Sequence, residues 1–255
     1  MGGSAAERRR PGAQVDAYLA ELARRGREVL GERLVGVYAG GSLALGAYEQ
    51  GRSDLDVAVV VEGRLPTEVK EALVAAWRHE SLACPARGLE LVAYSRDAAA
   101  SPSVDFELNL NTGRGMAFRA DFAVDPAIGT HWFAIDRSIL RQHALAVVGP
   151  PARDVFAEIP REALVPVVAE SLRWHEESGE PLGDDSVLNA CRALRWTRTG
   201  EWTSKPEAGR WALNTRAADV ATVAAALAAR TGGPPIPAED AAELLSAVRA
   251  SIGGT

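Results

Sequence analysis

The chain has 255 residues, of which 47% are hydrophobic, and this is enough for one large domain or two smaller ones. Its 28 Lys and Arg against 34 Asp and Glu give a formal net charge of -6 at pH 7. This balance leaves no overall basic surface for nucleic acid, which argues against a template-reading polymerase, and it suits a cationic substrate.

The cysteines and the hydropathy of the chain exclude two further classes of protein. Cys84 and Cys191 are far apart and have no metal-ligand spacing, so they predict neither a disulfide nor a zinc site. No stretch is long and apolar enough to span a membrane, and the basic start of the chain has no apolar run behind it. We therefore expect a cytoplasmic protein.

The first half of the chain alternates predicted helices and strands, which is typical of a mixed sheet with helices. Apolar residues at helical spacing predict a helix over 15–32, and a second helix is expected over 66–79. The first turns of another helix are expected over 43–48. Short apolar or alternating runs predict strands over 34–39, 55–61, 89–94, 106–113 and 114–122.

The second half of the chain reads as helical. A Pro-rich connection is expected over 149–160, and no strand is predicted beyond residue 130. Helical patterns recur over 131–144, 161–177, 185–199, 206–215, 217–231 and 238–252. We therefore expect an α+β domain over 1–149 and an all-α helical bundle over 150–255.

A glycine turn followed by two aspartates dominates the first half, in the segment GGSLALGAYEQGRSDLDVAVVV at residues 40–61. Gly41 and Ser42 follow a predicted strand, where glycine lets the backbone approach a ligand closely and the next helix offers N–H groups to phosphate. The spacing of Asp54 and Asp56 puts both carboxylates on one side of the next strand. Carboxylates paired in this way favour a cation between them, and oxygen ligands suit Mg²⁺ shared with substrate phosphates.

Glu90 is a third candidate carboxylate. It stands between Leu89 and Leu91 in an otherwise apolar predicted strand, where a charge is costly unless it has a partner. If this strand lies beside that of Asp56, Glu90 completes a three-carboxylate site, in which it shares a metal or acts as general base on an acceptor hydroxyl. The alternative is a charge at a strand edge without a catalytic role.

These motifs resemble a known family. GSLALG followed by SDLDVAVVV is similar to the signature of the polymerase-β-like nucleotidyltransferase superfamily. GPPARDVFAEIP and then VLNACRALRWTRTGEWTSKPEAGRWAL resemble the C-terminal helical domain of the streptomycin/spectinomycin adenylyltransferase family, and the resemblance spans about residues 35–213. It implies transfer of AMP from ATP to a hydroxyl of an aminoglycoside-type antibiotic, with release of pyrophosphate.

The resemblance also implies roles for residues on the nucleotide side. Asp54 and Asp56 correspond to the ligands of two Mg²⁺ ions, and Glu90 corresponds to the catalytic base. Ser42 and Ser53 correspond to contacts on the phosphate side.

Two cations of the helical half, Arg192 and Lys205, stand where family members hold the ATP phosphates. Cations there would neutralise charge that develops on the pyrophosphate. From the pattern alone, Arg192 reads as a solvated helix charge and Lys205 as a lysine at a helix start.

Asp184, Asp185 and Trp174 are candidates for binding the acceptor. The two aspartates open a predicted helix, where they either cap it and favour its dipole or pair with cationic groups of the antibiotic. Trp174 matches a family position near the drug, although a tryptophan on a helix is more often part of the core. The best-known members place a tryptophan that helps to select streptomycin before the helical domain, whereas none lies between His79 and Trp132 here, so the acceptor stays open.

The leading hypothesis is thus a monomeric nucleotidyltransferase that uses ATP and Mg²⁺ on a small cationic acceptor, an aminoglycoside or spectinomycin, without nucleic acid or membrane partners. A second hypothesis keeps the transfer and changes the acceptor to a protein side chain or another metabolite. A third is a non-catalytic nucleotide-binding regulator. This third hypothesis predicts a missing catalytic carboxylate, whereas Asp54, Asp56 and Glu90 are all present.

Overall fold

The computed structural model describes residues 12–102, 105–124, 131–179 and 181–253. The basic start of the chain was part of the argument for a cytoplasmic protein, and it lies outside the described residues. Contacts divide the chain into two compact units: unit 1 takes residues 1–124 and 143–157, and unit 2 takes residues 125–142 and 158–255. The chain therefore passes between the units more than once, and the single boundary at residue 149 stays a prediction.

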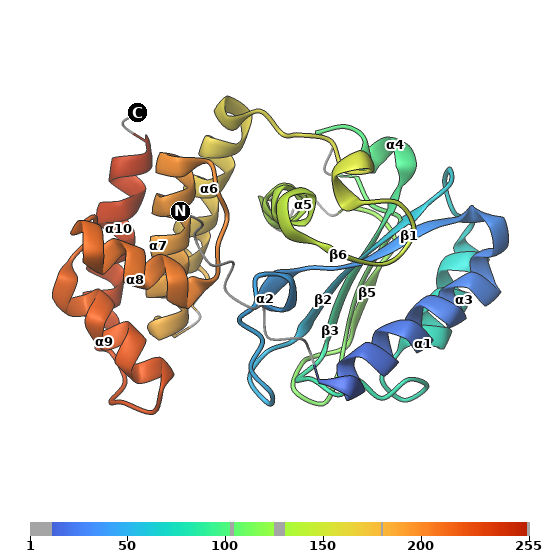
Figure 1. Cartoon of the computed structure of the whole chain (residues 1–255), viewed down its shortest axis with the longest axis horizontal. Coiled ribbons are helices and arrows are strands. Elements are labelled where there is room, and N and C mark those ends of the chain that lie inside the picture. The colour runs from blue at the N-terminus through green and yellow to red at the C-terminus, as the bar shows by residue number, and fades with distance from the viewer. Residues whose placement is uncertain (1–11, 103–104, 125–130, 180, 254–255) are drawn as a thin grey trace, which may run out of the picture. The chain divides into compact units, whose positions relative to one another are not determined.

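Unit 1 is built on a six-stranded mixed sheet with the strand order β5-β4-β3-β2-β1-β6 (Figure 1). β2 and β3 run parallel, and the other neighbouring pairs are antiparallel. The strands are β1 (Leu34–Ala39), β2 (Leu55–Val61), β3 (Leu89–Ser95), β4 (Leu108–Thr112), β5 (Arg119–Asp121) and β6 (Leu145–Val148). The predicted mixed sheet with helices is confirmed.

Two helices, α1 (Ala13–Leu30) and α3 (Thr67–Trp77), pack on one face of this sheet. The apolar residues of α1 recur at helical spacing and are buried in the same core as alternate residues of β2 and β3. Trp77 of α3 links the two helices, because its indole N–H donates a hydrogen bond to the carbonyl of Leu22 in α1 at 3.0 Å. Gly26 makes this contact possible, since a Cβ there would lie 2.8 Å from the Trp77 ring.

The structure corrects two local expectations in unit 1. The helix expected over 43–48 is a single turn, α2 (Gly41–Ala44), that starts earlier and ends before Leu45. The expectation of no strand beyond residue 130 is wrong, because β6 pairs antiparallel with β1 at the edge of the sheet. β6 has only four residues and none of them is fully buried, so its apolar pattern was too short and too exposed to stand out.

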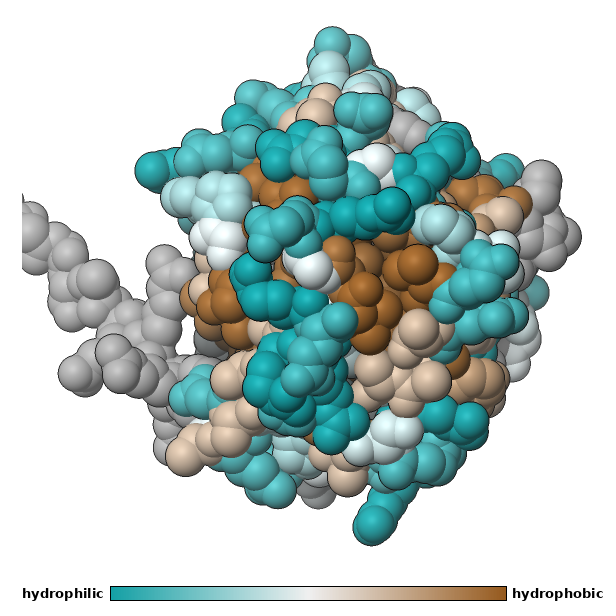
Figure 2. All heavy atoms as spheres, turned by 90° about the vertical axis from the view of Figure 1, so that its right-hand side faces the viewer, coloured by the Kyte–Doolittle hydropathy of each residue, from teal (hydrophilic) through white to brown (hydrophobic). Residues whose placement is uncertain are grey.

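The side of unit 1 that lies on the right of Figure 1 is turned to the viewer in Figure 2. Hydrophilic side chains cover most of this face, and apolar side chains gather in one area near its centre. The carboxylates of interest lie elsewhere in unit 1, on the opposite face of the sheet from α1 and α3. This follows from the register, because Leu55 and Val57 point into the helix-covered core and Asp56 between them points away.

Unit 2 is helical and confirms the predicted all-α bundle. Its helices are α5 (His131–His143), α6 (Arg161–Glu177), α7 (Asp184–Thr199), α8 (Lys205–Thr215), α9 (Val220–Arg230) and α10 (Ala238–Gly253). α7 is the central helix, with most of its residues buried against α6, α8, α9 and α10. None of the helices in the described ranges has the length and apolar run needed to cross a membrane.

α5 is joined to the connection between α7 and α8 by three polar contacts. The backbone N–H of Trp202 donates to the Gln142 side chain at 2.9 Å, and the Gln142 amide donates to the carbonyl of Gly200 at 2.8 Å. The Trp202 indole N–H donates to the Ser138 hydroxyl at 2.8 Å. These bonds hold Trp202 in place beside the candidate phosphate-binding arginine of α7.

Candidate active site

The glycine turn after β1 wraps closely around the carboxylate of Asp56. The Gly40 N–H donates to the Asp56 carbonyl at 2.8 Å, which ties the end of β1 to the start of β2. Gly41 has a φ of 49°, in the left-handed region that glycine tolerates best. A Cβ at Gly41 would lie 1.6 Å from Asp56 Oδ2, so only glycine permits this approach.

The two serines of the motif differ in how the structure uses them. Ser42 Oγ is buried and has no hydrogen-bond partner among the described residues. Ser53 is also buried, but its Oγ accepts a bond from the Glu49 N–H at 3.0 Å and so closes the loop between α2 and β2. The Ser42 hydroxyl is therefore available to form a hydrogen bond with a ligand at the turn, whereas the Ser53 hydroxyl already accepts one from the loop.

The strand pairing brings the predicted carboxylates together. Asp56 of β2 and Glu90 of β3 are direct neighbours in the parallel register, and Asn111 of β4 is the next residue across. Both carboxylates are half-buried. The condition on which the sequence argument for Glu90 rested, a strand beside that of Asp56, is met.

Asp54 lies two residues before Asp56, and its carboxylate binds Arg87. The guanidinium Nη2 of Arg87 lies 2.6 Å from Asp54 Oδ2. Within the described ranges, no three His, Cys, Asp or Glu side chains come together as a ready metal-binding group. The donor set still fits Mg²⁺ in kind, because Mg²⁺ prefers oxygen ligands and is usually bound by one or two carboxylates together with substrate phosphates. Asp56 and Glu90 supply neighbouring carboxylates, and the unused hydroxyl of Ser42 lies at the adjacent turn.

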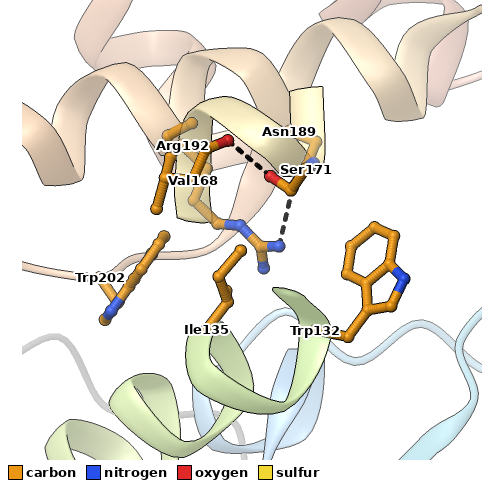
Figure 3. A pocket seen from close by; sticks show the side chains of 8 residues that line it. Trp132, Ile135, Val168, Ser171, Asn189, Arg192 and Trp202 are labelled. Atoms are coloured by element: carbon orange, nitrogen blue, oxygen red, sulfur yellow. Dashed lines mark hydrogen bonds between the residues drawn. The ribbon is translucent and has the colours of Figure 1, made fainter. Parts of the chain in front are cut away.

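The predicted phosphate-binding arginine lies in a pocket of unit 2. Arg192 of α7 donates to Asn189 Oδ1 at 2.7 Å, and its guanidinium carbon lies 5.9 Å from the centroid of the Trp202 ring. Figure 3 shows the Arg192 side chain extending across the pocket, with Trp132 on one side and Trp202 on the other. The pocket is lined by Trp132, Ile135, Val168, Ser171, Asn189, Arg192, Ala193 and Trp202.

A hydrogen-bond chain connects this arginine to a histidine of α6. Because Asn189 Oδ1 accepts from Arg192, its amide nitrogen faces His175 Nε2 at 3.2 Å and donates to it. His175 must then keep Nε2 unprotonated. Burial, together with the nearby Lys205, lowers the pKa of His175 to about 4, so the ring is neutral at pH 7.

The predicted phosphate-binding lysine and one predicted acceptor residue pair with each other. Lys205 Nζ lies 2.5 Å from Asp185 Oδ2, and Arg230 Nη1 lies 3.1 Å from Asp185 Oδ1. Asp185 thus bridges two cations. Neither Asp184 nor Asp185 caps α7, because Gly183 is the N-cap and its N–H donates to the Ser186 hydroxyl at 2.9 Å.

Trp174 lies at the surface of an aromatic cluster. Its side chain is about one-third exposed and meets the Trp132 ring edge to face, with the centroids 5.2 Å apart. His131 and His175 flank the same pair, at centroid distances from Trp174 of 6.1 and 5.3 Å. An exposed edge-to-face tryptophan pair offers a π surface to a cationic ligand.

Sequence reasoning missed several residues of these clusters. Arg87 and Arg230 belong to no motif, and Asn189 was given no role although it lies in the segment that resembles the helical domain; each becomes relevant only through a partner far away or on another element. His175 is the exception, because it directly follows Trp174 on a helix whose pattern was recognised.

Two family models match the chain. The model of the nucleotidyltransferase domain matches residues 23–91, which include the glycine turn and all three carboxylates. The model of the C-terminal domain of aminoglycoside adenylyltransferase matches residues 154–252, which include α6 to α9 and all but the last residue of α10. Residues 23–91 thus belong to the nucleotidyltransferase domain family, and residues 154–252 belong to the family of C-terminal domains of aminoglycoside adenylyltransferases. The chain is an enzyme, a nucleotidyltransferase.

A solved structure supports the same assignment at the level of the fold. The chain matches spectinomycin adenyltransferase AAD(9) from Enterococcus faecialis, a structure with ATP and spectinomycin, with a TM-score of 0.68. The match covers 93% of this chain and 98% of the other, at 16% sequence identity. Comparison with curated proteins finds no match.

Proposed function

We propose that this enzyme transfers AMP from ATP to a hydroxyl of a cationic aminoglycoside-type acceptor, of the streptomycin or spectinomycin class. The proposal rests above all on one observation: Asp56 and Glu90 are neighbours in the sheet beside the Gly41 turn, in a chain whose C-terminal half matches the helical domain of this family. The negative net charge of the chain is consistent with a cationic acceptor.

Each side of the reaction has candidate residues. In this proposal Asp54 and Asp56 hold two Mg²⁺ ions, which when bound offset the charge of the triphosphate. Gly41 keeps the cradle open, Ser42 and Ser53 donate to phosphate oxygens, and Arg192 and Lys205 bind the phosphates as cations.

Glu90 acts as the base in this proposal. The acceptor hydroxyl gives its proton to the Glu90 carboxylate while its oxygen forms a bond to the α-phosphorus of ATP. The bond from that phosphorus to the bridging oxygen breaks, and pyrophosphate leaves with the electron pair. A positioned base of this kind contributes about 10²–10⁴-fold to the rate.

For the acceptor we propose Asp184 and Trp174 as contacts, through charge and through the π face of the indole. Asp185 was expected beside them. Because it bridges Lys205 and Arg230, we propose instead that it holds these two cations in position.

The experiment that tests the proposal measures pyrophosphate release from ATP and Mg²⁺ with streptomycin or spectinomycin added separately. Release should require a drug, and Glu90→Gln should lower it at least a hundredfold. Glu62→Gln is the matched control, because Glu62 follows the far end of β2 and pairs with Arg96 on the surface. Mg-ATP binding without release would move the acceptor to a protein or another metabolite, and the absence of Mg-ATP binding would refute the proposal.

A further inference from the structure

The backbone of Arg87 is fixed from two sides. Its N–H donates to the carbonyl of Ser53 at 3.1 Å, and its own carbonyl accepts from the Gly115 N–H at 2.9 Å. The next residue, Gly88, accepts from the Leu55 N–H at 2.9 Å. Arg87 is therefore held beside the start of β2, where Asp54 and Asp56 lie.

The connection between β4 and β5 makes room for this arginine. A Cβ at Gly115 would lie 2.4 Å from Arg87 Cγ, and a Cβ at Gly113 would lie 2.4 Å from the Gly88 Cα. A side chain at either glycine would therefore displace Arg87 or its neighbour. The place of the Arg87 side chain thus depends on two glycines as well as on its own ion pair.

The ion pair uses the same carboxylate that the proposed metal centre needs. Arg87 Nη2 lies 2.6 Å from Asp54 Oδ2, and the Asp54 side chain is 23% exposed. A guanidinium and a metal ion both require the lone pairs of the carboxylate oxygens, and two cations in contact with one small carboxylate repel each other. Asp54 therefore cannot serve both fully at once.

We propose that Arg87 competes with divalent metal for the carboxylate of Asp54, so that metal binding requires the Arg87–Asp54 ion pair to open. This inference rests on the proposed function, since it assumes that Asp54 is a metal ligand. It makes Arg87 a residue that weakens the binding of free metal and stabilises Asp54 beside the Asp56 and Glu90 carboxylates. Arg87 lies outside the segment at residues 40–61 that carries the glycine turn and the two aspartates.

The expected effect is modest because the pair is partly exposed. Exposed ion pairs change equilibria by about 1.5- to 5-fold, so removal of the guanidinium should tighten metal binding by a factor in this range. The side chain of Arg87 is 46% exposed and is not part of the hydrophobic core, so we expect its replacement by alanine to leave that core unchanged.

The test titrates the full-length protein with Mn²⁺ alone and measures free Mn²⁺ by electron paramagnetic resonance. Arg87→Ala should bind Mn²⁺ about 1.5- to 5-fold more tightly than the wild-type protein. Arg96→Ala is the matched control, because Arg96 also pairs with an exposed carboxylate, that of Glu62, but follows the far end of β3. This control should bind Mn²⁺ as the wild-type protein does.

A double variant distinguishes competition for the Asp54 carboxylate from a general effect of the positive charge of Arg87 on metal binding. In the Asp54→Asn background, Arg87→Ala should no longer change Mn²⁺ affinity, because the contested carboxylate is gone. An equal gain in that background would mean that Arg87 acts through its charge alone and would overturn the inference.

The remaining outcomes distinguish this inference from the proposed function. If Asp56→Asn weakens Mn²⁺ binding while Arg87→Ala matches the wild-type protein, the metal centre stands and competition by Arg87 is refuted. If wild-type protein and Asp56→Asn give identical titrations, the proposed metal centre fails and the inference falls with it. Circular dichroism of each variant establishes that it is folded.

Discussion

Gly41 offers the sharpest test of how the turn after β1 supports the reaction. Gly41→Ala adds one methyl group at a point 1.6 Å from Asp56 Oδ2, where real contacts of a Cβ do not fall below 3.0 Å. Either the Asp56 carboxylate or the turn must move by more than an ångström. Because Asp56 is a proposed metal ligand and Glu90 is its neighbour, this movement should affect the reaction directly.

The magnitude has two separable parts. Alanine in the left-handed conformation of Gly41 costs about 1–2 kcal/mol of stability, because its Cβ crowds the following carbonyl. Misplacement of a reacting group by about 1 Å costs about a hundredfold in rate. We therefore expect Gly41→Ala to be slightly less stable and to release pyrophosphate about a hundred times more slowly.

Gly46→Ala is the control that isolates the second part. Gly46 also has a positive φ, 69°, but nothing lies within 4 Å of a Cβ placed there. Both variants should show a similar loss of stability in urea denaturation, and only Gly41→Ala should show the loss of rate. Wild-type activity in Gly41→Ala, or equal losses of activity in both variants, would refute the reasoning.

Three further predictions concern pH, positioning and metal. The pKa of His175 is lowered to about 4 by burial, against about 6.5 in the unfolded chain, so stability present at pH 7 is lost as the pH falls from 6.5 toward 4. Between pH 7 and pH 5, the free energy of unfolding measured with urea should therefore fall by about 1 kcal/mol less in His175→Gln than in the wild-type protein. This is about half the full linkage value, because the ring is partly exposed. Equal falls in both proteins would argue against a buried neutral His175. Asp185→Asn should raise KM for ATP about three- to tenfold and leave KM for the drug nearly unchanged, because Lys205 and Arg230 would lose the charge-assisted contact that holds them in position. The reverse pattern in steady-state kinetics would mean that Asp185 contacts the acceptor. Removal of divalent cations with EDTA should abolish pyrophosphate release and leave the thermal melting curve unchanged, because the core of unit 1 is apolar; residual release would contradict the metal requirement.

The sequence predicted the elements that depend on local pattern. β1 and β2 have the expected bounds, because short, largely apolar runs, with glycine after β1 and aspartate before β2, leave little ambiguity. α6 also begins and ends where its helical spacing predicts, despite Pro166 inside it. A charge inside an apolar strand needs a partner nearby, so the role of Glu90 depended on its strand lying beside that of Asp56, and the register meets this condition.

The features that the sequence could not reveal depend on contacts between distant segments. β6 is recognisable as a strand only through its pairing with β1, because four partly exposed residues carry almost no periodicity. The closeness of Gly41 to Asp56 likewise joins two separate segments and is encoded by no spacing. The sequence predicted that Asp54 is a metal ligand, but the arginine that binds its carboxylate is 33 residues away and outside every motif.

The same physics explains why candidate ligand-binding residues pair with each other in both units. A side chain that binds a charged ligand must be charged and partly exposed, and such a side chain also attracts any opposite charge within reach. Asp54 meets Arg87 in unit 1, and Asp185 meets Lys205 in unit 2. The Asp54–Arg87 pair is exposed enough to open at small cost, so a metal ion can displace the arginine, whereas the contact with Asp185 keeps Lys205 in position for a triphosphate. Spacing in the sequence thus identifies which groups are charged and where they lie on an element, whereas the three-dimensional pairing determines which of them a ligand must displace and which it finds already in position.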